Sequence, residues 1–213
     1  MQVELENYIL SHIDAEPVHL KRLNRDTHVE CLYSNMCSGH LQGRLLKMFV
    51  RMIKPRHILE LGTFTGYSAL CLAEGADEGT SVDTIEINDE LEDFICRHFV
   101  PPYDEMIHLH IGDAETVLDT LGKEWDLVFI DANKRNYLDY YHMVFPHVKP
   151  GGFIIADNTL WYGKVTDSTI HDAQTAGINR FNDFIALDNR IEKVMIPLRD
   201  GLTIIYKKLS ESS

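Results

Sequence analysis

The sequence is poor in the features that mark several large classes of protein. Its 213 residues contain only four cysteines and no C-x-x-C pair, which argues against a disulfide scaffold or a cysteine-rich zinc site. The four thiols are expected to be reduced and partly buried. A membrane-spanning helix needs about 20 consecutive apolar residues, and no apolar run in the sequence approaches this length. The acidic N-terminus also lacks a signal-peptide pattern. We therefore expect a cytoplasmic protein that does not enter a membrane.

Positive charge is also scarce. The chain has 20 Lys and Arg against 33 Asp and Glu, for a formal net charge of -13. This charge repels phosphate backbones at long range and disfavours nucleic acid as a bulk partner. The 11 histidines form no H-E-x-x-H motif or comparable spacing, so none is assigned to a metal. Small molecules are the expected partners.

The patterning that is present predicts an α/β fold. With 45% hydrophobic and 25% charged residues, the chain is long enough for one compact domain. From Arg56 onward, β-branched runs alternate with amphipathic stretches, which is typical of a parallel sheet wrapped by helices. The expected strands are 58–61, 82–87, 107–111, 127–131, 153–157, 191–196 and 202–207. The expected helices are 68–73, 89–98, 115–121, 137–144 and 173–187. The connection at 197–201 is too short for a helical crossover, so the last two strands should be antiparallel.

The first 55 residues lack strand signals and are predicted to be helical. An apolar stripe at helical spacing precedes Pro55 and is expected to face the core. Its members are Leu41, Leu45, Met48, Phe49 and Met52. We expect residues 1–55 to form a helical cap that packs on the main domain, residues 56–213, or covers its mouth, the two together making one structural unit.

A glycine-bearing turn follows the first predicted strand and precedes a helix, as in nucleotide-binding folds. In a dinucleotide fingerprint the second glycine lets a pyrophosphate approach the backbone, but Phe64 occupies that position here. NAD is therefore disfavoured. Gly62 and Gly66 still permit the close approach that an adenosyl group requires, and Glu60 can face a cationic amino acid moiety. The loop favours an adenosine ligand without a pyrophosphate.

Acidic residues follow the next two strands. Glu86 ends the second strand beside the glycine loop, where a carboxylate can accept both hydroxyls of a ribose. Asp113, next to Gly112 after the third strand, can receive an adenine amino group. Any one such acid is about as well explained by a helix cap or a solvated charge. Acids at successive strand ends favour a binding function.

The fourth and fifth predicted strands also end in carboxylates, Asp131 and Asp157. Adjacent parallel strands bring these side chains to the same sheet edge, where two anions repel unless a cation lies between them. Asn158 adds a neutral oxygen. Oxygen ligands with open positions suit Mg²⁺, Mn²⁺ or Ca²⁺ better than zinc. The sequence therefore predicts a divalent-cation site that leaves room for substrate oxygens.

Lys134 lies three residues beyond Asp131 and is the candidate general base. A nearby divalent cation disfavours a charged amine and acidifies a coordinated hydroxyl, which makes proton transfer to Lys134 reasonable. The alternative is that Lys134 only forms an ion pair with Asp131.

Together these motifs resemble the class I, S-adenosylmethionine-dependent O-methyltransferases of the cation-dependent caffeoyl-CoA and catechol group. The resemblance spans roughly residues 36–208. It rests on Glu60 to Thr63 with Gly66 to Ser68, Glu86, Gly112 to Ala114, Phe129 to Lys134 with Tyr137, Pro150 to Gly152, Asp157 and Asn158 with Trp161 and Gly163, Phe181 and Asn182, and Pro197 with Asp200 to Leu202. Each motif is weak alone, but their order and spacing together are specific.

The resemblance implies a Rossmann-like seven-stranded sheet, mostly parallel with an antiparallel last strand, helices on both faces and an N-terminal helical extension. It implies S-adenosylmethionine and a divalent cation, Mg²⁺ with Mn²⁺ or Ca²⁺ as alternatives, as cofactors, and a homodimer. The expected cofactor shell is Met36, Glu60, Gly62, Thr63, Ser68, Glu86, Asp113, Ala114 and Asp131. The expected metal ligands are Asp131, Asp157 and Asn158, and the expected catalytic residues are Lys134 and Asp131.

The implied reaction moves a methyl group to a hydroxyl of a small catechol-like or related vicinal-diol acceptor. Trp161 and Tyr162 could flank an aromatic ring, although such residues are as often ordinary loop packing.

Three alternatives remain open at this stage. Relatives in the same group methylate a hydroxylated uridine in transfer RNA, which a basic patch could dock; its members are Arg22, Arg25, Lys54 and Arg56. A NAD-dependent dehydrogenase would use the same type of sheet, and a non-catalytic binding module would leave the carboxylate cluster unused.

Overall fold

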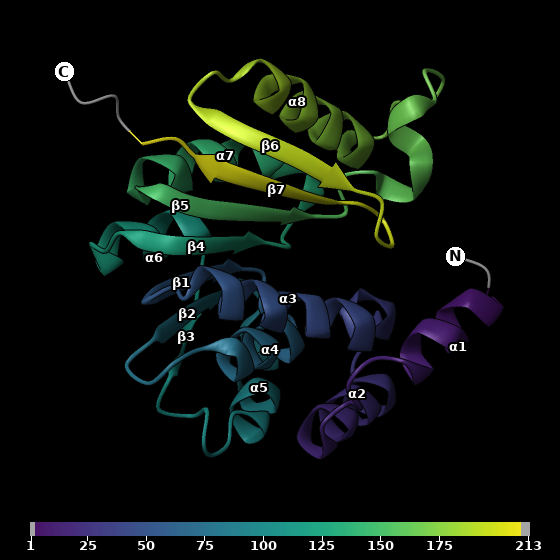
Figure 1. Ribbon diagram of the computed structural model, residues 1–213, viewed down its shortest axis with the longest axis vertical. Helices are drawn as coiled ribbons and strands as arrows, with labels where there is room; N and C mark the ends of the chain where they lie inside the picture. The colour runs from purple at the N-terminus through teal and green to yellow at the C-terminus, as the bar shows by residue number, and fades with distance from the viewer. Residues whose placement is uncertain (1–2, 210–213) are drawn as a thin grey trace.

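Seven strands form one sheet in the order β3-β2-β1-β4-β5-β7-β6, shown in Figure 1. The computed structural model describes residues 3–209. The strands are β1 (His57–Leu61), β2 (Ser81–Glu86), β3 (Ile107–Ile111), β4 (Trp125–Ile130), β5 (Val148–Asp157), β6 (Ile191–Ile196) and β7 (Leu202–Lys207). Neighbours among β1 to β5 pair in parallel, whereas β7 is antiparallel to both β5 and β6. The predicted Rossmann-like sheet with an antiparallel last strand is confirmed.

Helices cover both faces of the sheet (Figure 1). The α-helices are α1 (Val3–Ser11), α2 (Val18–Glu30), α3 (Gly39–Ile53), α4 (Tyr67–Gly75), α5 (Glu92–His98), α6 (Ala114–Leu121), α7 (Tyr137–Val144) and α8 (Ala173–Leu187). The 3-10 helices are η1 (Ser34–Met36), η2 (Asp89–Leu91), η3 (Lys134–Asn136), η4 (Phe145–His147) and η5 (Trp161–Thr166).

The sheet separates two hydrophobic cores because successive residues of a strand point to opposite faces. In β4, Leu127 and Phe129 pack with α2 to α5, whereas Val128 and Ile130 pack with α6 to α8. All four side chains are fully buried. This two-sided burial explains why the central strands are continuous apolar runs rather than alternating ones.

The start of β5 differs from the prediction of a strand beginning at residue 153. The strand begins at Val148 and runs through Gly152, and its register against β4 shifts near Trp125. A Cβ on Gly152 would lie 2.9 Å from the carbonyl oxygen of Lys149 and 3.0 Å from that of Asp126. Gly152 therefore allows a close backbone approach inside an irregular strand pair.

The predicted core stripe on α3 is confirmed at Phe49 and Leu45, which pack in or against the core, but it is wrong at Met48 and Met52. Met48 and Met52 are 53% and 65% exposed, and Leu41 and Leu45 are only partly buried. The buried face of α3 instead includes two polar side chains, Gln42 and Arg44. Arg44 forms an ion pair with the buried Glu74 of α4, and Gln42 reaches the end of β5. Because both polar groups have partners, burying them is tolerated, which a pattern of hydrophobicity does not reveal.

The N-terminal segment packs on the sheet domain through α2 and α3. Leu20 and Leu23 of α2 and Leu46 of α3 are fully buried in the core that α4 shares. In contrast, α1 has no buried residue and projects from the body near the N-terminus (Figure 1). The division into residues 1–55 and 56–213 stays a prediction. The outer ends of these two segments, residues 1–2 and 210–213, lie outside the described part of the chain.

The four cysteines lie within the described residues and are free. Cys37 and Cys71 are buried and Cys31 is partly buried, whereas Cys96 is exposed, so the expected burial is wrong for Cys96. Within residues 3–209, no helix has both the length and the apolar character needed to cross a bilayer.

Candidate active site

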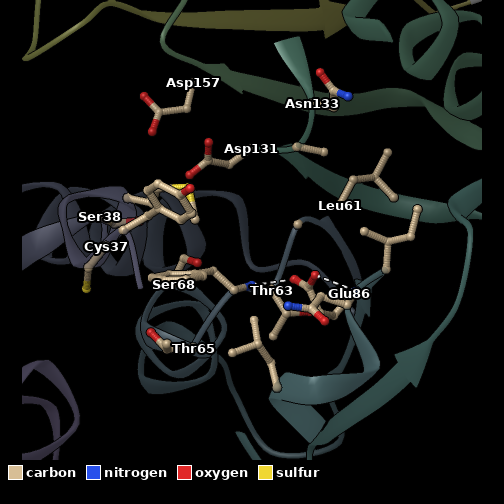
Figure 2. Close-up of a pocket in the computed structure, with 18 of the residues that line it drawn as sticks. Cys37, Ser38, Leu61, Thr63, Thr65, Ser68, Glu86, Asp131, Asn133 and Asp157 are labelled. Atoms are coloured by element: carbon tan, nitrogen blue, oxygen red, sulfur yellow. Dashed lines mark hydrogen bonds between the residues drawn. The ribbon is translucent and has the colours of Figure 1, made fainter. Parts of the chain in front are cut away.

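A cavity of about 1500 Å³ opens at the carboxyl ends of β1 to β5. Ligands bind at this edge in open α/β sheets because loops from several strands converge there. The lining includes every sequence-predicted site residue except Glu60: Met36, Gly62, Thr63, Ser68, Glu86, Asp113, Ala114, Asp131, Lys134, Asp157 and Asn158. Figure 2 shows several of these side chains converging on the pocket.

The glycine loop after β1 is fixed by close backbone contacts. Gly62 has a φ of +97°, and a Cβ there would lie 2.2 Å from the carbonyl oxygen of Asp131. The backbone N–H groups of Gly62 and Thr63 both donate to the carbonyl oxygen of Ile85, at 3.0 and 3.2 Å. Only glycine satisfies both the dihedral and the space at this position. The loop is therefore held against the ends of β2 and β4, which brings Asp131 beside it.

The carboxylate of Glu86 is held by backbone donors on both sides. The N–H of Phe64 donates to Oε2 at 2.7 Å, and the N–H of Asn88 donates to Oε1 at 2.9 Å (Figure 2). Each oxygen keeps a further lone pair for a ligand. A rigid carboxylate with both oxygens available suits a pair of neighbouring hydroxyls, as a ribose presents.

Glu60 lies beside the cavity lining and is fully buried. Its Oε2 accepts a hydrogen bond from the Thr84 hydroxyl at 2.5 Å, whereas Oε1 is buried without a partner among the described residues. Burial raises the pKa of Glu60 to about 8, opposed by the hydrogen bond from Thr84. An unpartnered buried carboxylate oxygen fits a cationic group such as the ammonium of S-adenosylmethionine.

Asp113 caps a helix and lines the cavity at the same time. Its carboxylate accepts the backbone N–H of Glu115 at 3.0 Å as the N-cap of α6. Ala114 is the first residue of that helix. The capping and binding interpretations of this residue are therefore compatible, since a carboxylate has more acceptor sites than the cap uses.

Asp131 and Asp157 meet at the ends of the adjacent strands β4 and β5, and Figure 2 shows their carboxylates on the same side of the pocket. Asp157 is only 3% exposed. Burial, followed by the nearby charge of Asp131, raises the pKa of Asp157 to about 6. The Lys134 ammonium lies 2.7 Å from Oδ1 of Asp131. The ion pair that the sequence suggested as an alternative role for Lys134 is therefore present.

The predicted metal ligands offer two carboxylates and one amide. No group of three or more His, Cys, Asp or Glu in residues 3–209 is arranged to hold a metal ion. Asn158 lines the same cavity directly after Asp157 and has a φ of +56°. Two carboxylates and an amide oxygen are the donor set that hard divalent cations prefer, so these residues fit Mg²⁺, Mn²⁺ or Ca²⁺.

Sequence reasoning missed Gln42, Arg199 and part of the role of Tyr137. The Gln42 amide donates to Oδ2 of Asp157 at 2.5 Å, and Arg199 donates to Oε1 of Gln42 at 2.9 Å. The Tyr137 hydroxyl donates to the backbone carbonyl of Asp157 at 2.9 Å, with the carbonyl of Ile130 as a second acceptor within reach at 3.3 Å. Tyr137 was identifiable as part of a motif, but nothing in the local sequence marks Gln42 or Arg199 as neighbours of Asp157.

Aromatic side chains border the cavity beyond the carboxylates. Trp161 and Tyr162 both line it, and their ring centroids lie 5.4 Å apart. Both residues have positive φ values, 44° and 55°, and Tyr162 is 68% exposed. An exposed ring at the rim is available to a ligand.

Comparisons with known proteins agree on one family. The model of the O-methyltransferase family matches residues 10–208. The chain is 34% identical to a caffeoyl-CoA O-methyltransferase of Medicago sativa, over 94% of this chain and 87% of that protein. It is 31% identical to the caffeoyl-CoA O-methyltransferase of Stellaria longipes, over 94% of this chain and 88% of that protein.

A solved structure extends the likeness to a cofactor complex. The O-methyltransferase TomG from Streptomyces achromogenes, in complex with S-adenosylmethionine, superposes with a TM-score of 0.90 at 26% identity and covers 98% of this chain and 99% of that one. The matching fold, the glycine loop and the orphaned carboxylate beside it point to the same cofactor. The chain belongs to the O-methyltransferase family and is an S-adenosylmethionine-dependent O-methyltransferase of the caffeoyl-CoA O-methyltransferase type.

Proposed function

We propose that this enzyme is cation-dependent and methylates one of two neighbouring oxygens on a small catechol-like acceptor. The observation that carries the proposal is the pair of strand-end carboxylates, Asp131 and Asp157, beside the buried Lys134 in the same cavity as the glycine loop. The acceptor class is also supported by relatives named for caffeoyl-CoA, whose caffeoyl group contains a catechol ring.

The cofactor is proposed to lie along the glycine loop. When bound, S-adenosylmethionine supplies an electrophilic methyl group on a sulfonium. Glu86 accepts the ribose hydroxyls on its two fixed oxygens, and Glu60 faces the ammonium through its unpartnered Oε1. Met36, Thr63, Ser68, Asp113 and Ala114 complete the proposed shell. These contacts align the methyl group for in-line transfer, which is the main contribution of positioning to rate.

Asp131, Asp157 and Asn158 are the proposed ligands of the divalent cation. When bound, the cation supplies a Lewis acid that makes an acceptor hydroxyl easier to deprotonate. Lys134, in the neutral amine form that a bound cation would favour, would then accept the hydroxyl proton on Nζ. The acceptor oxygen then forms its bond to the methyl carbon while the carbon–sulfur bond breaks, and the electron pair remains on sulfur in S-adenosylhomocysteine.

The test is a methyl-transfer screen of catechols, hydroxylated acyl thioesters and transfer RNA, each with and without added metal. We expect turnover of a catechol-like acceptor that stops on chelation by EDTA and returns with Mg²⁺ or Mn²⁺. Turnover that is unchanged by EDTA would contradict the cation site. Salt-sensitive methylation of transfer RNA alone would instead favour the hydroxyuridine alternative.

The N-terminal segment is proposed to act as a cap over the cofactor. Its support is a hydrogen bond of 3.1 Å from the Thr27 hydroxyl of α2 to Thr65 of the glycine loop, together with the place of Met36 in the cavity lining.

We also propose that the protein forms a homodimer, as the family resemblance implies. Light scattering of the purified protein measures this directly.

A further inference from the structure

Gln42 joins three segments that are far apart in the chain. It lies on α3, is 1% exposed, and donates its amide to Oδ2 of Asp157, 115 residues away. Arg199, in the turn between β6 and β7, donates to the other end of the same amide at 2.9 Å. Arg199 also donates to the backbone carbonyls of Ser38 and Cys37, just before α3. The N-terminal segment and the β6–β7 turn therefore meet at the carboxylate that ends β5.

The chemistry of Arg199 fixes which way the Gln42 amide points. A guanidinium has only donors, so the amide atom that faces Arg199 must be the carbonyl oxygen. The NH₂ group then faces Asp157, where it can donate. If the amide flipped, its NH₂ would face the Arg199 donors and its oxygen would face the carboxylate, leaving two unfavourable contacts in a buried place.

Asp157 is consequently held at both oxygens. Gln42 donates to Oδ2 at 2.5 Å, and the backbone N–H of Asn158 donates to Oδ1 at 2.8 Å. Carboxylate oxygens have further lone pairs, so two donors orient the group without filling it. Hydrogen-bond partners of metal ligands are known to set ligand orientation and affinity.

The donor from α3 is also neutral. The cluster of Asp131, Asp157 and Lys134 carries two negative charges and one positive charge when all three are ionised. An amide at position 42 orients Asp157 without cancelling the remaining negative charge, whereas a second ammonium would cancel it. The amide therefore separates Asp157 from the guanidinium of Arg199, so no further positive charge is hydrogen-bonded to that carboxylate through Gln42.

We propose that Gln42 and Arg199 are positioning residues, in which Arg199 orients the Gln42 amide and the amide sets the carboxylate of Asp157 for a divalent cation. This inference rests on the proposed cation site. It makes the N-terminal segment a contributor to that site as well as a cap over the cofactor.

The experiment is a double-mutant cycle of Gln42→Met and Arg199→Met, read by Mn²⁺ binding with electron paramagnetic resonance in the absence of acceptor. Met has about the length of Gln but cannot donate to Asp157. We expect Gln42→Met to weaken Mn²⁺ binding by about 10- to 100-fold, the usual effect of losing such a partner. Arg199→Met should weaken it less in the wild-type background and have no further effect in the Gln42→Met background, because Arg199 acts through the amide.

Arg51→Met is the matched control, since Arg51 is on α3 and contacts only Asp77 and the Glu74 carbonyl among the hydrogen bonds of the described chain. It should bind Mn²⁺ like the wild type. If Gln42→Met melts too low to assay, Gln42→Asn keeps the amide but shortens the side chain, and the same loss is expected.

Two failures are distinguishable. Wild-type protein that binds S-adenosylmethionine but no Mn²⁺ overturns the proposed cation site, and this inference with it. Wild-type protein that binds Mn²⁺, with a Gln42→Met variant within about twofold of it, overturns the positioning role alone. Equal effects of Arg199→Met in both backgrounds overturn the relay from Arg199 through Gln42.

Discussion

Glu86 and Asp157 are both buried carboxylates at strand ends in one cavity, but their hydrogen-bond donors come from different distances along the chain. Glu86 is held by the backbone of Phe64 and Asn88, in the glycine loop and just beyond its own strand. Asp157 is held by its neighbour Asn158 and by Gln42 on a helix 115 residues away. At the cofactor end of the cavity, Glu86 is thus held by backbone groups of adjacent loops. At the proposed cation end, Asp157 also needs a side chain from the N-terminal segment.

The largest effect that separates the two ends is expected from Asp157→Ala. It should abolish metal-dependent turnover, because it removes a proposed ligand, while much of the affinity for S-adenosylmethionine remains. Methyl transfer and calorimetric cofactor titration measure the two properties side by side. Asp119→Ala, at an exposed carboxylate on α6, is the control and should change neither. Equal loss of cofactor affinity and turnover in Asp157→Ala would show that the ends are not separable.

Lys134 is tested by two substitutions that separate its possible roles. Lys134→Ala should lower kcat by roughly 10² to 10⁴, the usual contribution of a general base, with little change in cofactor affinity. Lys134→Arg keeps a cation for the ion pair with Asp131 but cannot act as a base at neutral pH. It should therefore be nearly as slow as Lys134→Ala. Full kcat in Lys134→Arg across the pH range would assign Lys134 to the ion pair alone.

Gly62→Ala should disturb both ends, because its Cβ would meet the backbone of Asp131 at 2.2 Å. A non-glycine residue at this dihedral should lower the free energy of unfolding by about 1–3 kcal/mol. The glycine loop must also move to make room for the Cβ, so the affinity for the cofactor should fall as well. Gly122→Ala is a matched control, since its φ is also positive at +55° but a Cβ there has no atom within 4 Å. Urea unfolding and cofactor titration of the two variants separate backbone strain from the clash. Similar behaviour of both variants would contradict the close contact.

The one expected effect that appears only in the cofactor-free protein is a pH dependence of stability that comes from Glu60. Its pKa is raised to about 8 in the folded protein, above the ordinary value of 4.5, so the folded state holds this proton more tightly than the unfolded state. The resulting penalty is absent below about pH 4.5 and grows until about pH 8. Cofactor-free wild type should lose stability relative to Glu60→Gln over this window, as measured by urea unfolding. A constant difference between the two proteins from pH 5 to pH 8 would contradict the raised pKa.

The sequence predicted the sheet and the strand-end acids well because both are recorded locally. Alternation of apolar runs with amphipathic stretches predicted the strands to within a few residues, except that β5 begins earlier than expected. The α3 stripe was only partly right, because the buried face includes Gln42 and Arg44, whose partners, Asp157 and Glu74, lie far along the chain. Hydrophobic periodicity assigns such residues to the solvent side.

By itself the sequence determined the parallel sheet, the glycine that the turn after β1 requires, and which strands end in a carboxylate. These features follow from backbone geometry and short-range patterning. Only the tertiary structure decided that one oxygen of Glu60 has no partner within residues 3–209, and that Arg199 meets Gln42 and Gln42 meets Asp157. The reason is physical: a buried polar side chain is stable only with its partner, and that partner becomes a neighbour only when the chain folds.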